Sequence, residues 1–127
     1  MASYPALPSC TPAELARVST SVHNDTVVVA ARGDVDAARV PRVLAALVAA
    51  LTDRPSKRVV LDLSRVTFLG SHGLAMLVDI SARAAARGVV FRLVVGDRHT
   101  VIRALEVTGI AAGFTLYPSL NEAVTQP

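Results

Sequence analysis

Residues 57–74 read KRVVLDLSRVTFLGSHGL, and the sequence of strand, loop and helix within them decides the expected fold. Residues 57–63 have an apolar centre, which predicts a strand covered on both faces. We interpret residues 64–73 as a loop. The following residues predict a helix that ends at Gly88. The residues that recur at helical spacing and form its expected inner face are Leu74, Leu77, Val78, Ser81 and Ala85.

The segments upstream of this stretch predict a hairpin and a helix. Residues 15–22 and 26–32 are rich in β-forming residues and are joined at Asn24 and Asp25, a turn-forming pair. Apolar residues recur at helical spacing in residues 39–52. Pro41 suits the start of that helix, where no backbone N–H is needed.

The segments downstream continue the alternation. Residues 89–95 and 114–117 are expected strands, and Asp97 and Gly109 bound a short helix between them. Ser119 stands three residues before a glutamate, which is the spacing of a capping box and predicts a last helix. The expected order is ββαβαβαβα. It indicates an α/β domain with a mixed sheet, an N-terminal hairpin and packed helices.

Length and composition favour one small soluble domain. The chain has 127 residues, of which 52% are hydrophobic, yet its longest purely apolar run is the nine residues 43–51. A membrane-spanning helix needs about 20. We expect residues 1–13, with three prolines, to be a flexible tail and residues 14–125 to form the domain. No secretory leader is visible, and Cys10 is the one cysteine, so we expect a cytoplasmic protein without a disulfide.

The basic character of the chain does not point to nucleic acid. The net charge is +3, but the arginines are scattered singly and the chain has only two Tyr, three Phe and no Trp. A nucleic-acid site needs clustered cations, with aromatic residues for stacking. We therefore interpret the arginines as solvated surface residues and expect no direct contact with nucleic acid or membrane.

Ser71 is the residue most indicative of function. It lies between Gly70 and Gly73 at the start of the expected helix. It can serve as N-cap or first-turn residue, its oxygen accepting from free N–H groups. It can equally be a phosphoacceptor, because the two glycines leave the backbone accessible and a helix N-terminus tolerates an added phosphate.

The sequence resembles the STAS domains, in particular the bacterial anti-sigma factor antagonists, over about residues 15–124. The stretches that carry the resemblance are GDVD at 33–36, VLDLS at 60–64, FLGSHGL at 68–74 and RALEVTGI at 103–110. The resemblance implies a phosphoprotein that regulates transcription by binding an anti-sigma factor, which is also a serine kinase of the histidine-kinase-like ATPase type. The unphosphorylated protein would release the sigma factor. Phosphorylation of Ser71 would switch it off, and a serine phosphatase would reset it.

The site implied by this resemblance is a docking rim formed by Asp36, Gly70, Ser71, His72 and Gly73. The family loop usually reads Asp-Ser-(Ser, Ala or Thr)-Gly, so two positions depart from it. Gly70 stands where the family has an acid, and His72 stands where it has a small residue. The first departure removes a carboxylate beside the phosphoacceptor. Asp36 matches the acid of the neighbouring loop and can also be an ordinary helix cap.

Two alternatives remain. The first is an interaction module of the same fold that works without phosphorylation, which the absence of an acid at Gly70 favours. The second is a small serine hydrolase, since Ser71, Asp97 and His99 follow the chain order of a catalytic triad. Leu69 occupies the position of the first glycine in the hydrolase motif, so that motif is half present. We expect no catalytic residue, no cofactor and no metal site, because the histidines lack ligand spacing and no nucleotide-binding glycine motif follows a strand.

Overall fold

The computed structural model describes residues 18–53, 56–97 and 99–127. The expected tail and the start of the first expected strand lie outside the described residues. The elements in chain order are β2 (Val18–His23), β3 (Thr26–Val35), α3 (Val40–Thr52), β4 (Arg58–Leu69), α4 (Ser71–Ala86), β5 (Val90–Val94), α5 (His99–Val107), the 3-10 helix η1 (Ile110–Gly113), β6 (Thr115–Tyr117) and α6 (Leu120–Thr125). The predicted order ββαβαβαβα is confirmed; η1 is the one element in this range that the sequence did not predict.

The strands form one five-stranded sheet in the order β2-β3-β4-β5-β6. β2 and β3 are the antiparallel hairpin that was predicted, with His23 paired to Thr26 across the turn. Asn24 adopts φ 57°, a left-handed conformation that asparagine tolerates better than most residues. The pairs β3–β4, β4–β5 and β5–β6 are parallel, so the carboxyl ends of these strands meet at one edge of the sheet.

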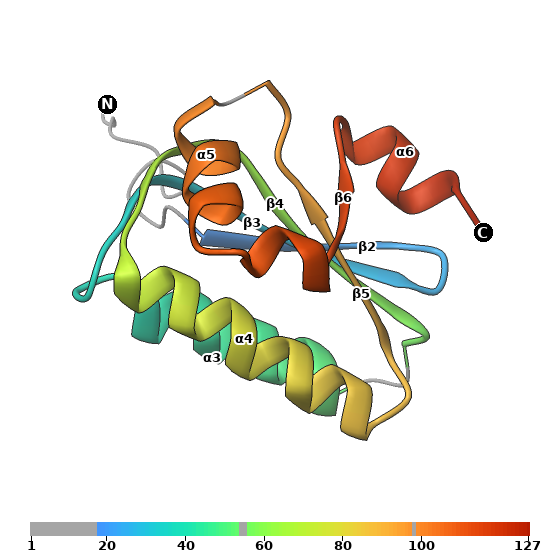
Figure 1. The fold of residues 1–127 in the computed structure, drawn as a ribbon. Coiled ribbons are helices and arrows are strands. Elements are labelled where there is room, and N and C mark those ends of the chain that lie inside the picture. The colour runs from blue at the N-terminus through green and yellow to red at the C-terminus, as the bar shows by residue number, and fades with distance from the viewer. Residues whose placement is uncertain (1–17, 54–55, 98) are drawn as a thin grey trace, which may run out of the picture.

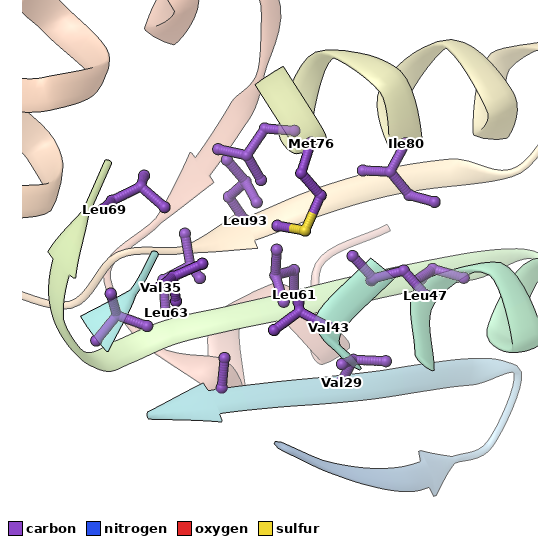
Figure 2. Close-up of a cluster of buried hydrophobic side chains, with 14 of the residues drawn as sticks. Val29, Val35, Val43, Leu47, Leu61, Leu63, Leu69, Met76, Ile80 and Leu93 are labelled. Atoms are coloured by element: carbon purple, nitrogen blue, oxygen red, sulfur yellow. The ribbon is translucent and has the colours of Figure 1, made fainter. Parts of the chain in front are cut away.

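The helices α3, α4 and α5 pack on one face of the sheet, and α6 packs on the other. Figure 1 shows the path of the chain through these elements. α3 and α4 run side by side, and their side chains Val43, Leu47, Met76 and Ile80 point toward the sheet residue Leu61 (Figure 2). α5 completes this layer through Val101 and Leu105, both fully buried. The core is aliphatic, and alternate residues of β3, β4 and β5 supply its sheet side.

α6 packs on the opposite face of the sheet. Its Ala123 lies in a small buried cluster with Val28, Val60 and Val94. Arg92 is buried beside this helix and donates to three backbone oxygens, those of Ala123 at 2.9 Å, Gln126 at 2.7 Å and Pro127 at 2.6 Å. The interpretation of all arginines as surface residues is therefore wrong for Arg92. Its guanidinium satisfies carbonyls that the end of α6 leaves without helical partners.

The predicted helix ends are confirmed where local chemistry sets them. Pro41 stands in the first turn of α3. Past the end of α4, Gly88 adopts φ 69° and Val89 N–H donates to the Ala84 carbonyl at 2.9 Å, which is a Schellman ending. At the start of α6 the Ser119 hydroxyl accepts from Glu122 N–H at 3.3 Å, as in a capping box. No helix within the described ranges is both long and apolar enough to span a membrane.

The inner face of α4 differs from the predicted one. The buried residues are Gly73, Met76, Leu77, Ile80 and Ala84. Leu77 is fully buried as expected and Leu74 packs against the core from a half-buried position, whereas Val78 is 52% exposed and Ala85 is also exposed. The predicted face was rotated about the helix axis: it omitted Met76 and Ile80, which share helical spacing with Leu77, and Gly73, which carries no hydrophobic signal.

β4 is longer than predicted, because residues 64–69 are strand rather than loop. Along this extension β4 has extra residues relative to β3: the pairing steps from Ala30–Asp62 to Arg32–Arg65 and from Gly33–Val66 to Asp34–Phe68. These are β-bulges, and they interrupt the two-residue alternation by which a strand is recognised. The bulges explain why the sequence pattern suggested a loop.

Candidate partner-docking site

Ser71 is the first residue of α4, and its side chain is exposed. The N-cap is Gly70, with φ −86° and ψ −176°, and no side chain caps the helix. Ser71 is thus a first-turn residue, and the N-cap role we considered for it is wrong. Among the described residues its hydroxyl has no hydrogen-bond partner, so chemical modification of that oxygen would break no observed contact.

Two loops at the carboxyl edge of the sheet meet beside Ser71. Gly70 N–H donates to the Val35 carbonyl at 3.3 Å, which joins the end of β4 to the end of β3. Asp36 follows Val35 and therefore lies next to the start of α4. This contact places Asp36, Gly70 and Ser71 close together, because adjacent parallel strands end at the same edge.

The Asp36 carboxylate also has a structural role. One oxygen accepts from Arg39 N–H at 3.2 Å, and the other lies 3.6 Å from the Arg39 guanidinium. This interaction closes the turn that leads into α3. The N-cap of α3 is Arg39 and no side chain caps that helix, so Asp36 stabilises the preceding turn and is not the helix cap. The side chain is still 45% exposed. A partner protein could therefore contact the same carboxylate from solvent.

The two glycines of the site have different surroundings. A Cβ atom on Gly73 would lie 2.5 Å from Leu69 Cδ1 and 3.3 Å from Val35 Cγ1, so a side chain there would overlap the core. Gly73 is buried and allows α4 to approach the ends of β3 and β4 closely. A Cβ on Gly70 would meet only the edge of the Phe68 ring, at 3.0 Å. Gly73 thus has a packing role beneath the docking rim, whereas Gly70 lies at the rim's surface.

The other polar residues named from the sequence form no hydrogen bond with Ser71 in the described part of the chain. His72, Asp97 and His99 are exposed, and within the described ranges no hydrogen bond joins Ser71 to Asp97 or His99. Within the same ranges no group of three or more His, Cys, Asp or Glu side chains could hold a metal ion. The geometry gives Ser71 no general base, so nothing in it supports the hydrolase alternative.

Phe68 is the residue of this site that sequence reasoning missed. It is 49% exposed at the end of β4, with its ring edge against Gly70. Its signal in the sequence was the break in strand alternation between Leu63 and Leu69. We interpreted this break as a loop, whereas it marks a bulge at which consecutive side chains of β4 change the face they point to.

Comparison with known proteins identifies the family. The STAS domain model matches residues 17–123, and the chain belongs to the STAS domain family. The anti-sigma-F factor antagonist RsfA of Mycobacterium tuberculosis is 33% identical over 118 residues, which cover 91% of each chain. The resemblance noted in the sequence, and the fold class it implied, are thereby confirmed.

Solved structures give the same result. An anti-sigma factor antagonist from Mycobacterium paratuberculosis superposes with a TM-score of 0.76 at 31% identity, covering 85% of this chain and 90% of that one. The Bacillus cell fate determinant SpoIIAA in its phosphorylated form superposes with a TM-score of 0.65 at 18% identity, covering 84% of this chain and 96% of that one. The second likeness concerns the fold alone.

Proposed function

We propose that this protein is an anti-sigma factor antagonist, or anti-anti-sigma factor, which acts by binding and catalyses no reaction itself. In this proposal the unphosphorylated protein binds an anti-sigma factor that is also a serine kinase, and the bound sigma factor is released. Phosphorylation of Ser71 switches the protein off, and a serine phosphatase restores it. The kinase supplies the ATP site, so this chain needs no cofactor, and the cytoplasm is the compartment where it would act.

The observation that carries the proposal is the position of the Ser71 hydroxyl. It is exposed on the first residue of α4, has no capping role and no partner within the described ranges. A kinase active site can approach it without unfolding any element. A phosphate at this position would lie near backbone N–H groups of the first turn, which have no helical acceptor and favour an anion.

The electrostatics of the rim explain how one phosphate could switch binding. A phosphoserine adds about −1.5 to −2 charges at neutral pH. The rim already presents the half-exposed Asp36 carboxylate, and Phe68 is an apolar neighbour. A partner surface that fits these groups would have to desolvate the phosphate or face repulsion. Either cost reaches several kcal/mol. Each 2.8 kcal/mol lowers the affinity for the partner by about two orders of magnitude.

The experiment that tests this function uses mass and affinity together. The protein is incubated with ATP and candidate anti-sigma kinases, including the anti-sigma-F factor of Mycobacterium tuberculosis, and intact mass is followed. We expect one added phosphate on the wild type and none on Ser71→Ala. Thr100→Ala is the matched control, because Thr100 is an exposed hydroxyl in the first turn of α5, and it should label like the wild type.

Binding of the same kinases separates the proposal from its main alternative. We expect Ser71→Ala to bind and Ser71→Glu to bind weakly. Equal labelling of the wild type and Ser71→Ala would contradict the site assignment. Binding by both variants, with no labelling of the wild type, would favour an interaction module that works without phosphorylation. The observation that favours this second candidate is Gly70, because it stands where the family has an acidic residue beside the phosphoacceptor.

A further inference from the structure

The second bulge of β4 leaves Phe68 outside the core. The core-facing residues of this strand are spaced two apart up to Leu63 and three apart after it, at Val66 and Leu69. Alternation continued from Val66 would have placed Phe68 inward. Instead Thr67 and Phe68 are both exposed, while Val66 and Leu69 are 0% and 4% exposed.

The contacts around the second bulge fix this arrangement. Gly33, with φ 79°, pairs with Val66 immediately before the register changes. Just after the change Asp34 pairs with Phe68, and the Thr67 hydroxyl donates to an Asp34 carboxylate oxygen at 2.7 Å. A bulge of this kind re-aims side chains and is common beside functional sites. The fold thus holds a large aromatic side chain half in solvent by a specific backbone irregularity.

Phe68 is continuous with the docking rim. Its ring edge would lie 3.0 Å from a Cβ atom on Gly70, and Gly70 directly precedes Ser71. Asp34, exposed near the end of β3, is the residue paired with Phe68 across the two strands. Exposed aromatic residues that become buried at an interface are among the side chains that contribute most to affinity.

We propose that Phe68 is the apolar anchor of the partner-docking surface, and that its ring enters an apolar pocket of the anti-sigma factor beside the site where Ser71 docks. This inference rests on the proposed function and adds the residue that supplies affinity. It also explains how a phosphate on Ser71 would weaken binding, namely by opposing burial of the Phe68 ring. Burial of the ring requires the docking rim to lose its water. A phosphate on the neighbouring Ser71 opposes this, because desolvating its charge is costly.

Affinity measurements with matched variants test this anchor. Calorimetric titrations use the kinases of the labelling experiment, with the anti-sigma-F factor of Mycobacterium tuberculosis among them. Phe68→Ala should weaken binding by about 30-fold or more, the effect of an interface hot spot. Val90→Ala is the control: Val90 is also 49% exposed but lies at the amino end of β5, at the opposite edge of the sheet, so its affinity should stay within about 2-fold of the wild type.

A second measurement needs no substitution at the anchor. The chain has three phenylalanines, so labelling with 4-fluorophenylalanine gives three fluorine signals. Phe91 and Phe114 pack edge to face with ring centroids 6.0 Å apart, away from the rim in sequence and partly buried in the main core. On addition of the kinase the Phe68 signal should shift, and the other two should not. This result would stand even if Phe68→Ala failed to fold.

Several results would overturn the inference. Unchanged affinity of Phe68→Ala while the wild type binds would overturn the anchor and leave the proposed function intact. A Phe68 fluorine signal that stays constant on saturation would do the same. Loss of self-association in Phe68→Ala, with kinase affinity kept, would assign the ring to a contact between copies of this chain. If the wild type neither binds nor is labelled, the proposed function fails, and the anchor fails with it.

Discussion

Replacing Gly73 with alanine tests whether the start of α4 is held by close packing on the ends of β3 and β4. The added methyl group would lie 2.5 Å from Leu69 Cδ1, where ordinary contacts are near 4 Å. Leu69 is 4% exposed and Val35 is 1% exposed, so neither side chain has free space into which to move. We expect the core to resist the methyl group.

The magnitude follows from two opposing effects. Alanine is preferred over glycine inside a helix by about 1 kcal/mol, which would stabilise the variant. Overpacking of a dense core costs about 1 to 3 kcal/mol. Gly73 stands in the first turn of α4, where the propensity gain is smaller than in the interior. We therefore predict a net decrease in the free energy of unfolding of about 1 to 2 kcal/mol and a Tm lower by about 3 to 8 °C.

Urea and thermal unfolding followed by circular dichroism measure this change, with two controls. Gly113→Ala adds a methyl group where nothing lies within 4 Å, and it should change stability by less than about 0.5 kcal/mol. Ala75→Gly, at an exposed position of α4, measures the helix-propensity effect alone. A Gly73→Ala variant as stable as the wild type, with both controls as expected, would refute the close-packing argument.

Three further predictions concern the remaining structure. Arg92→Met removes three hydrogen bonds to the end of α6 and should lower the free energy of unfolding by about 2 kcal/mol or more, with faster amide exchange in α6. The control Arg83→Met removes an exposed ion pair and should change neither the free energy of unfolding nor the amide exchange of α6. Ser119→Ala removes the α6 capping box and should lower the unfolding free energy by about 1 kcal/mol; a chemical-denaturation midpoint equal to the wild type would contradict that role. Leu77→Ala creates a cavity in the core and should lower the free energy of unfolding by about 2 to 5 kcal/mol. Val78 is 52% exposed, so Val78→Ala should change that free energy by less than about 0.5 kcal/mol.

Much of the fold was predictable because short-range physics determines it. The turn at Asn24, the start of α3 at Pro41, the end of α4 at Gly88 and the cap at Ser119 each depend on one side chain and its immediate backbone. The strands other than β4 were recognised within one to three residues of their ends where the structure describes them. These are the features for which sequence spacing and backbone chemistry agree.

The errors arose where long-range contacts decide the structure. β4 continues to Leu69 because it pairs with β3, and its bulges hide that pairing from any pattern of alternation. Arg92 is buried because α6, about 30 residues later, places its carbonyls over β5. The inner face of α4 includes Gly73 because the ends of β3 and β4 lie there, and the large apolar residues Met76 and Ile80 lie on the same face.

For the candidate site, local sequence patterns were enough to single out Ser71 at a helix start, its two glycine neighbours and the segment around Asp36. Long-range packing sets which of these residues are buried and which are exposed. The tertiary structure places Gly73 in the core, ties Asp36 to Arg39, and leaves Ser71 and Phe68 exposed. The physical reason is that local spacing fixes which residues start a helix or end a strand, whereas the direction of a side chain at a bulge depends on the neighbouring strand.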